Sequence, residues 1–225
     1  PCGVFFQNRT REAAMAFKDA VGNGLFGNTI MVEIRVPWWR DQSYYNEPGR
    51  GTYARDGGGV LINQAIHTID LALWVLGPWK HVQAQLCKTE LHRMEAEDWA
   101  GAVFETLGGA VGTLMATTAA YPGASESIFL TGTKGNALLE AGVLTVNLND
   151  GSSSVIGQTS VSGGGADPMA FSHAWHQNII EDFCVSLSKD KAPLVSLRSA
   201  LQAHAVIDAM EQSSRTGHRV KVERL

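Results

Sequence analysis

The stretch AVGNGLFGNTIMVEIRV, residues 20–36, decides the fold class because it joins a predicted helix to a predicted strand. Within it, Gly22, Gly24 and Gly27 spell G-x-G-x-x-G, the spacing of a dinucleotide-binding turn. Such a turn lies between a strand and a following helix, whose free N–H groups bind the pyrophosphate. Here the order is inverted, because the helix comes first and the alternating strand follows. We therefore interpret the glycines as a helix end and the turn after it, where positive φ angles favour glycine.

The segments on either side of this stretch extend the pattern. Residues 2–7 (CGVFFQ) predict a short strand, and Thr10 is the predicted N-cap of the helix that ends at Gly22 or Gly24. Residues 38–55 are polar and aromatic and predict a long loop, a feature that is commonly functional.

Residues 58–76 predict a second helix, largely apolar, which ends before Gly77. From there to about residue 160 the sequence breaks into short strand-like runs separated by turn clusters such as PGAS, TKG and NDGSSS. This texture predicts a meander of antiparallel strands.

The last quarter of the chain is helical. The glycine-rich segment 160–168 predicts an exposed loop. Two amphipathic helices follow over 171–190 and 196–217, each beginning near a serine that can cap it, and 218–225 predict a closing strand. Strands grouped together with helices at the ends predict an α+β fold, an antiparallel sheet with helices packed on one face.

Composition excludes several classes of protein. The 225 residues are 44% hydrophobic and show neither repeat nor linker, so we expect residues 1–225 to form a single domain. The net charge of −4 argues against nucleic acid or an anionic membrane as partner. No run of about 18 apolar residues predicts a transmembrane helix, and no secretory signal opens the chain. Because the first residue is Pro1, we expect a processed or truncated piece.

The three cysteines, Cys2, Cys87 and Cys184, are odd in number and far apart. This spacing fits neither a disulfide framework nor a metal site. We expect ordinary buried thiols in a reducing cytoplasm.

Polar residues interrupt the apolar helix 58–76. Asn63, His67 and Asp70 stand at i, i+4 and i+7 and share one face. In a buried helix such groups must be hydrogen-bonded or functional. His67 is suited to accept a proton from a hydroxyl near neutral pH, and Asn63 could orient it or a substrate hydroxyl. The alternative is a structural histidine.

Two further groups are candidates for binding. His173 and His176 form H-x-x-H, which could hold a metal, although capping or substrate contact is the favoured interpretation because catalytic zinc needs three protein ligands. A metal-dependent hydrolase using His67, His173 and His176 is the weakest hypothesis. Arg40 and Arg50 bracket two tyrosines in the long loop, which would suit an anionic, ring-bearing substrate or simply be surface charge.

Six segments in consistent order resemble one known family: GVFFQNR, GNGLFGNTIMVEI, GGGVLINQAIHTIDLALWVLG, EDWAGAVFETLGGAVGTLMAT, LTGTKGNALLE and DFCVSLSKDKAPLVSLRSALQAHAVIDAMEQSSRTGHRVKV. Together they are similar to the C-terminal domain of the Gfo/Idh/MocA oxidoreductase family, over nearly the whole chain. The G-G-G…H-x-x-D helix is the most specific part. The resemblance implies a large, open, mostly antiparallel sheet with helices on one face. It further implies NAD(P)-dependent oxidation of a sugar or cyclitol hydroxyl, or the reverse, and dimers or tetramers built through the exposed sheet face.

The resemblance also assigns residues. His67 matches the catalytic histidine, Asn63 stands where many members have aspartate, and Asp70 matches an acid that we interpret as structural. The loop 40–59 is most similar to the branch of UDP-N-acetylglucosaminuronate 3-dehydrogenases. The implied substrate-facing residues are Gln7, Asn8 and Arg9, in a segment that approaches nicotinamide and substrate, together with Arg40, Tyr45 and Arg50 of the loop.

The family's Rossmann domain and its E-K-P lysine belong upstream of residue 1. The resemblance therefore implies a substrate-binding and oligomerisation domain whose full-length protein binds NAD or NADP. We expect this chain alone to bind no cofactor tightly, beyond possible contacts of Gln7 and Asn8, to bind no metal and to be inactive. The alternative is a non-catalytic sugar-binding or oligomerisation protein, and the upstream reading frame distinguishes the two.

Overall fold

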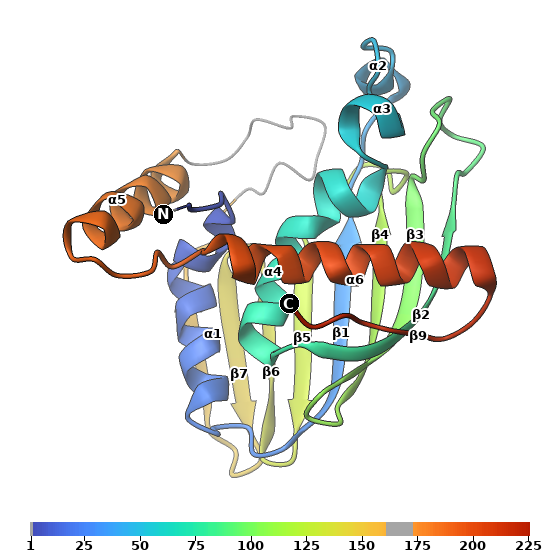
Figure 1. The fold of residues 1–225 in the computed structure, drawn as a ribbon. Coiled ribbons are helices and arrows are strands. Elements are labelled where there is room, and N and C mark those ends of the chain that lie inside the picture. Colours follow the sequence, from blue (N-terminus) through green and yellow to red (C-terminus); the bar gives the residue numbers. More distant parts are fainter. Residues whose placement is uncertain (1, 161–172) are drawn as a thin grey trace.

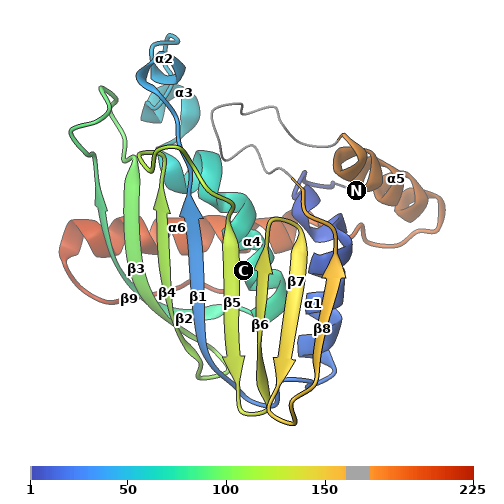
Figure 2. The same cartoon turned by 180° about the vertical axis from the view of Figure 1, so that it is seen from behind.

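One nine-stranded sheet organises the computed structural model, which describes residues 2–160 and 173–225 (Figures 1 and 2). The strands lie in the order β8-β7-β6-β5-β1-β4-β3-β2-β9. Within the described residues, neighbouring strands are antiparallel except β1 and β4, which run parallel. The α+β class and the mostly antiparallel open sheet are thereby confirmed.

The strands have these bounds: β1 Thr29–Pro37, β2 Trp79–Cys87, β3 Trp99–Thr106, β4 Val111–Thr117, β5 Ser127–Gly132, β6 Gly135–Glu140, β7 Val143–Leu148, β8 Ser153–Gly157 and β9 Val220–Lys221. Buried and exposed residues alternate along most of them, as a sheet with one covered face requires.

Helices cover one face of the sheet. In Figure 1, α1 (Glu12–Gly22), α4 (Ile66–Leu76) and α6 (Leu197–Thr216) lie across it, whereas Figure 2 shows the opposite face bare of helices. Side-chain hydroxyls fix α6 to β2, because Ser213 and Ser214 accept hydrogen bonds of 2.9 Å each from backbone amides of that strand. α5 (Ala174–Ser188) lies beside the N-terminal segment, beyond the edge of the sheet.

The core lies between this helical layer and the sheet. Its apolar strand side chains come from positions such as Ile34, Leu114 and Leu130, each at most 2% exposed. Trp79 and Phe104 stack at 3.7 Å between ring centroids. Gly112 leaves room for that pair, since a Cβ there would lie 2.3 Å from the Phe104 ring.

The opening glycines behave as the sequence indicates. α1 ends at Gly22, and Gly24 and Gly27 follow in a turn with φ of +70° and +68°. A Cβ on Gly27 would also lie 2.2 Å from the Thr133 hydroxyl oxygen. The string G-x-G-x-x-G therefore ends a helix and leads into β1, and the interpretation as a helix end and turn is confirmed.

Some local predictions were wrong. Residues 2–7 make only an isolated bridge, Gly3 to Ser196, because the chain turns into a short 3₁₀ helix, η1 (Gln7–Thr10). Thr10 does not cap α1, whose N-cap is Arg11. The Thr10 hydroxyl instead donates to the backbone oxygen of Gln7 at 2.8 Å.

The remaining local predictions concern the loop 38–55 and the last quarter of the chain. The loop 38–55 contains two short helices, α2 (Gln42–Tyr45) and α3 (Tyr53–Asp56), capped by Asp41 and Thr52. Ser196 caps α6 as expected. The predicted loop 160–168, apart from Ser160, and the start of the helix predicted over 171–190 lie outside the described residues.

The cysteine prediction was also wrong, because Cys2, Cys87 and Cys184 are all exposed on the described chain. They sit at the N-terminus, at the end of β2 and in α5, and each is exposed. By length and composition alone, the helical stretch 53–76 could cross a membrane. However, 72% of its apolar window is buried within the domain, as in a core helix.

Candidate functional site

The helix that carries His67 begins with a π-helical segment, η2 (Leu61–Ala65), which runs directly into α4. A wide turn of this kind is rare and recurs at functional sites. Its start is fixed by Glu97, which is buried and accepts backbone N–H groups of Gly59 and Leu61 at 3.1 Å each. Gly59 has no room for a side chain, because a Cβ would lie 1.8 Å from the Glu97 carbonyl oxygen.

A cavity of about 310 Å³ opens in front of this helix. Segments far apart in the sequence build it: the N-terminal segment, the residue before α1, the loop after β1, the π segment, the residue before β5 and the start of α5. Its lining residues are Phe5, Gln7, Asn8, Arg11, Trp38, Arg40, Tyr44, Asn63, Gln64, His67, Glu126, Trp175 and His176. The structure thus brings together Gln7, Asn8, Arg40, Asn63 and His67 from the predicted site.

The imidazole of His67 is neutral in this cavity. Burial, followed by the positive charges of Arg11 and His176, lowers its pKa to about 4, while Glu126 opposes the shift. Its Nδ1 is buried, and no described residue forms a hydrogen bond with the ring. The ring packs edge-on against Phe6 at 5.6 Å between centroids. A neutral imidazole without an internal partner is able to accept a proton from a bound molecule.

An ion pair beside His67 was not predicted from the sequence. Arg11 Nη1 donates to Glu126 Oε1 at 3.1 Å, and the Arg11 guanidinium lies 3.9 Å from the ring centre of Trp175. Both charged groups are largely buried, and Glu126 Oε2 has no partner within the described chain. The sequence offered no signal for this pair, because 115 positions separate its members.

The N-terminal segment presents two amides to the same cavity. The oxygen atoms Gln7 Oε1 and Asn8 Oδ1 are buried and lack hydrogen-bond partners among the described residues. Such acceptors are costly to bury unless a ligand donor or water satisfies them.

Asn63 lines the cavity, but its amide nitrogen is already used. Nδ2 donates to the backbone oxygens of Gly58 and Gly59 at 2.9 and 3.0 Å. Over the described chain no hydrogen bond joins Asn63 to His67. Asn63 therefore holds the start of the helix.

The structure places Arg9 apart from the cavity lining. Its Nε and Nη2 donate to the two carboxylate oxygens of Asp70 at 2.8 and 2.5 Å, and both side chains are buried. Burial raises the pKa of Asp70, and Arg9 offsets part of that rise. The pair links the N-terminal segment to α4, which agrees with the structural role inferred for Asp70.

Arg40 reaches the cavity from the loop after β1. Its guanidinium lies over the rings of Trp38 and Tyr44, at 5.3 and 5.5 Å from their centres. Nη1 donates to the Trp39 carbonyl oxygen at 2.6 Å. Burial lowers its pKa from the usual arginine value. A cation set over two aromatic rings suits an anionic group attached to a ring.

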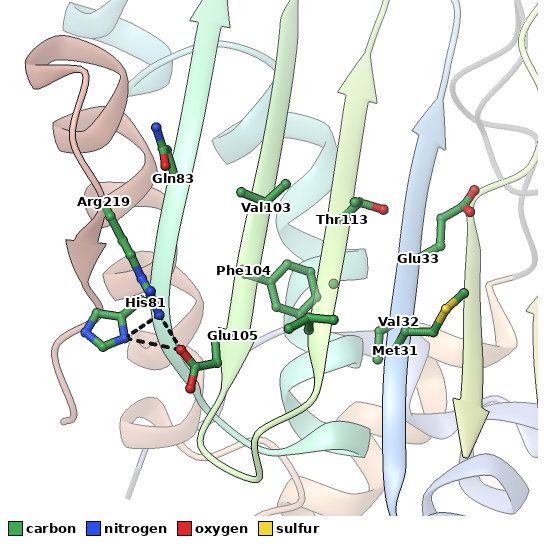
Figure 3. Close-up of a pocket in the computed structure, with 12 residues that line it drawn as sticks. Met31, Val32, Glu33, His81, Gln83, Val103, Phe104, Glu105, Thr113 and Arg219 are labelled. Atoms are coloured by element: carbon green, nitrogen blue, oxygen red, sulfur yellow. Dashed lines mark hydrogen bonds and ion pairs between the residues drawn. The ribbon is translucent and has the colours of Figure 1, made fainter. Parts of the chain in front are cut away.

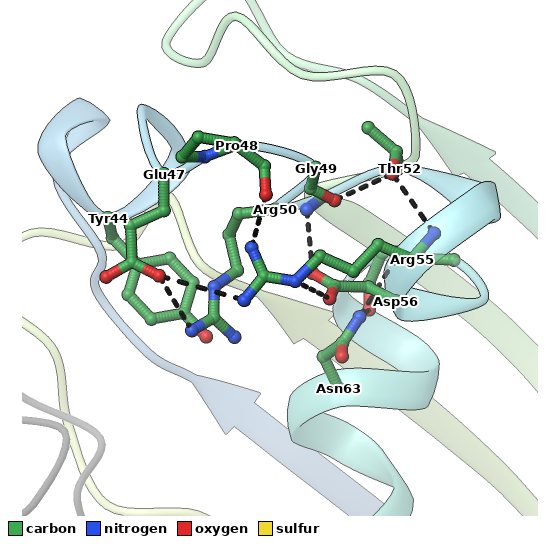
Figure 4. Close-up of polar contacts among 12 residues, drawn as sticks. Tyr44, Glu47, Pro48, Gly49, Arg50, Thr52, Arg55, Asp56 and Asn63 are labelled. Carbon is green, nitrogen blue, oxygen red and sulfur yellow. Dashed lines mark hydrogen bonds and ion pairs between the residues drawn. The ribbon is translucent and has the colours of Figure 1, made fainter.

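Tyr45 and Arg50 lie behind the cavity wall. The Tyr45 hydroxyl pairs with the Thr118 hydroxyl at 2.7 Å, and burial raises the pKa of Tyr45 to about 12. Arg50 pairs with Glu47 at 3.2 Å and lies 4.7 Å from the ring centre of Tyr44 (Figure 4). Both therefore contact Tyr44, which lines the cavity, and neither is among the lining residues themselves.

The two histidines of H-x-x-H are separated by the fold. His176 lines the cavity, whereas His173 is exposed and outside the lining. In residues 2–160 and 173–225, no three His, Cys, Asp or Glu side chains lie close enough to hold a metal ion.

A larger hollow of about 600 Å³ lies on the opposite, bare face of the sheet (Figure 3). Strands β1 to β4 form its floor, with apolar Met31, Val103 and Val111 beside charged Glu105 and Arg219. Of the described residues that line it, none has a buried side-chain polar atom without a partner. Its chemistry is that of a surface rather than of a reaction site.

Part of the cavity lies in a region of the chain that matches a known family. A family model of the GFO/IDH/MocA C-terminal domain matches residues 14–138, more than half of the chain. The chain belongs to the GFO/IDH/MocA family. Comparison with curated proteins finds no match.

Solved structures similar to this GFO/IDH/MocA domain include dehydrogenases. The WlbA dehydrogenase from Bordetella pertussis, solved with NADH and UDP-GlcNAcA, is 29% identical with a TM-score of 0.79; the match covers 98% of this chain and 63% of that one. WlbA from Chromobacterium violaceum, with the same ligands, is 27% identical with a TM-score of 0.77, covering 98% and 62%. Levoglucosan dehydrogenase, at 22% identity, a TM-score of 0.81 and coverage of 99% and 66%, shares the fold. The chain therefore spans less than two thirds of the length of the WlbA enzymes.

Proposed function

We propose that this domain binds the substrate of an NAD(P)-dependent dehydrogenase and holds a ring hydroxyl of a sugar or nucleotide sugar against His67. The observation that carries the proposal is the neutral imidazole of His67, which has no hydrogen-bond partner among the described residues and lies in a cavity lined by aromatic and cationic side chains. Membership of an oxidoreductase family and the dehydrogenase neighbours support it.

His67 would receive the proton of the hydroxyl that is oxidised. Its pKa of about 4 keeps the imidazole unprotonated at neutral pH, so the base needs no prior deprotonation. The family resemblance adds a lysine upstream of this chain on the other side of the hydroxyl. When bound, NAD or NADP supplies the hydride acceptor.

The two unpartnered amide oxygens, Gln7 Oε1 and Asn8 Oδ1, fit a nicotinamide or a substrate hydroxyl. Both ligands offer N–H or O–H donors, which is what these acceptors lack. We propose that they mark the side of the cavity that faces a nucleotide-binding domain outside this chain.

A nucleotide sugar that carries a carboxylate fits the charges of the cavity. Arg40, over the rings of Trp38 and Tyr44, offers a cation for the carboxylate, and Trp175 offers a flat face for a sugar ring. The neighbouring WlbA structures contain UDP-GlcNAcA, which has this chemistry. We therefore propose a UDP-linked uronate as the substrate class.

The bare face of the sheet is the proposed oligomer interface. Met31, Val103 and Val111 line the hollow and are 42%, 55% and 58% exposed; Figure 3 shows the first two. Exposed apolar patches of this kind mark contacts between proteins. We expect a dimer or tetramer, and Val103→Glu together with Val111→Glu should shift its mass toward the monomer in light scattering.

The decisive experiment follows NADH formation by the full-length protein with UDP-N-acetylglucosaminuronate and NAD⁺ or NADP⁺, together with calorimetric binding of the same sugar. Turnover supports the proposal. Binding without turnover under either cofactor would favour the alternative, a non-catalytic sugar-binding protein. Absence of binding would refute both.

A further inference from the structure

A buried histidine–aspartate pair lies directly behind Arg40. His92 is 3% exposed and Asp98 is fully buried. His92 Nδ1 lies 2.7 Å from Asp98 Oδ2, and His92 Nε2 lies 2.8 Å from the backbone oxygen of Arg40. The imidazole ring also packs against the ring of Tyr45, with 4.8 Å between centroids.

The partners of His92 fix its proton count. A backbone carbonyl only accepts hydrogen bonds, so Nε2 must carry a proton to bind the Arg40 oxygen. A carboxylate also only accepts, so Nδ1 must carry a second proton, unless Asp98 holds that proton itself. In either case the pair contains one proton more than a neutral imidazole beside a carboxylate. Thr89 donates both its backbone N–H and its hydroxyl to Asp98, at 2.7 and 2.6 Å, which favours the carboxylate.

The same pair fastens the loop that carries Arg40. The backbone N–H of Arg40 donates to the backbone oxygen of Thr118 at 2.8 Å. The backbone N–H of Thr118 in turn donates to the backbone oxygen of Asp98 at 3.0 Å. His92, which is paired with Asp98, donates to the backbone oxygen of Arg40. The backbone of Arg40 is therefore held from both sides, and one of the two contacts depends on a proton.

We propose that His92 is a positioning residue that, protonated on both nitrogens and paired with Asp98, holds Arg40 at the cavity for an anionic group of the substrate. The proposal rests on the proposed function, because it assigns Arg40 to a substrate anion. If His92 loses its second proton, the lone pair on Nδ1 faces the Asp98 carboxylate and the ring must turn or move. The hydrogen bond to Arg40 is then lost.

The charged and titratable groups around His92 are few. Asp98, the residue before β3, faces the ring; so do Tyr45 from α2 and Arg40 and Asp41 from the loop after β1. Asp41 is exposed, and its pKa is lowered chiefly by the hydrogen bond from Ser43, with the charge of His92 among the smaller causes. Of these neighbours, only Asp98 makes a hydrogen bond to the ring that requires the second proton.

The first test measures the protonation of His92 directly. We expect imidazole ¹⁵N chemical shifts of the full-length protein at neutral pH to show both nitrogens of His92 protonated, with His92→Gln assigning the signal. In Asp98→Asn, the amide can donate to Nδ1 and still accept from the Thr89 N–H, so His92 should become a neutral ring protonated on Nε2. Shifts of a neutral imidazole in the wild-type protein would overturn the proposal, whatever the protein does catalytically.

The second test connects the proton to binding. The dissociation constant of UDP-N-acetylglucosaminuronate should rise at least tenfold in His92→Gln, or when wild-type His92 loses its second proton. It should stay nearly constant with pH in Asp98→Asn. His204→Gln, an exposed histidine on α6, is the matched control and should bind as the wild type does.

The outcomes separate the two proposals. In His92→Gln, KM should rise far more than kcat falls, since Arg40 binds the substrate and does not react. Unchanged binding after His92 loses its second proton would refute the positioning role. If the wild type binds no sugar, the proposed function and the role of His92 at the cavity both fail. The ¹⁵N shifts then still decide the protonation of the pair.

Discussion

His67 should make the folded protein sensitive to mild acid. The unfolded chain protonates this imidazole near pH 6.5, whereas in the fold its pKa is about 4. Between these values the unfolded state binds more protons, so the free energy of unfolding falls as the pH falls. At about 1.4 kcal/mol for each pKa unit, the loss between pH 7.5 and pH 5 is about 2 kcal/mol.

Urea-induced unfolding at these two pH values measures the effect. His67→Gln removes the titrating group and should lose about 2 kcal/mol less than the wild type over the same interval. Burial raises the pKa of Asp70, Glu97 and Glu211, so these groups act in the opposite direction. They are common to both proteins and cancel in the comparison. The exposed His204→Gln should behave as the wild type. An equal loss in His67→Gln and the wild type would refute the reasoning.

Three further changes test separate parts of the structure. Asp70→Asn leaves a buried guanidinium without its carboxylate and should cost about 3–5 kcal/mol in urea unfolding; a cost below 1 kcal/mol would contradict a buried ion pair. Gly27→Ala should destabilise the protein by about 1–2 kcal/mol or more, because the φ of Gly27 is +68° and a Cβ there would meet Thr133. Gly22→Ala, at the end of α1 where a Cβ meets open space, should be neutral or stabilising by up to about 1 kcal/mol. Equal effects of the two substitutions would contradict the assigned turn. Arg11→Gln removes a positive charge that lowers the pKa of His67 and should raise that pKa in an NMR titration; an unchanged or lower value would contradict the electrostatics.

Local patterns predicted the elements that local forces determine. The inverted order around Gly22 and Gly27 identified the turn, because helix ends and positive φ angles depend on a few neighbouring residues. The serine at position 196 capped its helix for the same reason. The apolar helix with His67 was recognisable because polar residues in a buried helix stand out against their neighbours.

Contacts between distant residues were beyond such patterns. The resemblance implied that Arg9 faces the substrate, and only the fold brings it to Asp70, 61 positions away. The parallel pairing of β1 with β4 likewise depends on which strands meet after the chain has crossed the sheet. Short N-terminal segments are similarly ambiguous, since CGVFFQ has strand propensity and yet no strand beside it for more than one bridge.

The rate of hydride transfer in His67→Ala tests most directly whether this cavity is where the hydroxyl is oxidised. The imidazole has no hydrogen-bond partner in the described chain, so its removal leaves no buried group unsatisfied. In the full-length protein with UDP-N-acetylglucosaminuronate, kcat should fall by about 10²–10⁴-fold while the sugar still binds. A kcat close to that of the wild type would contradict the assignment of His67 as the base.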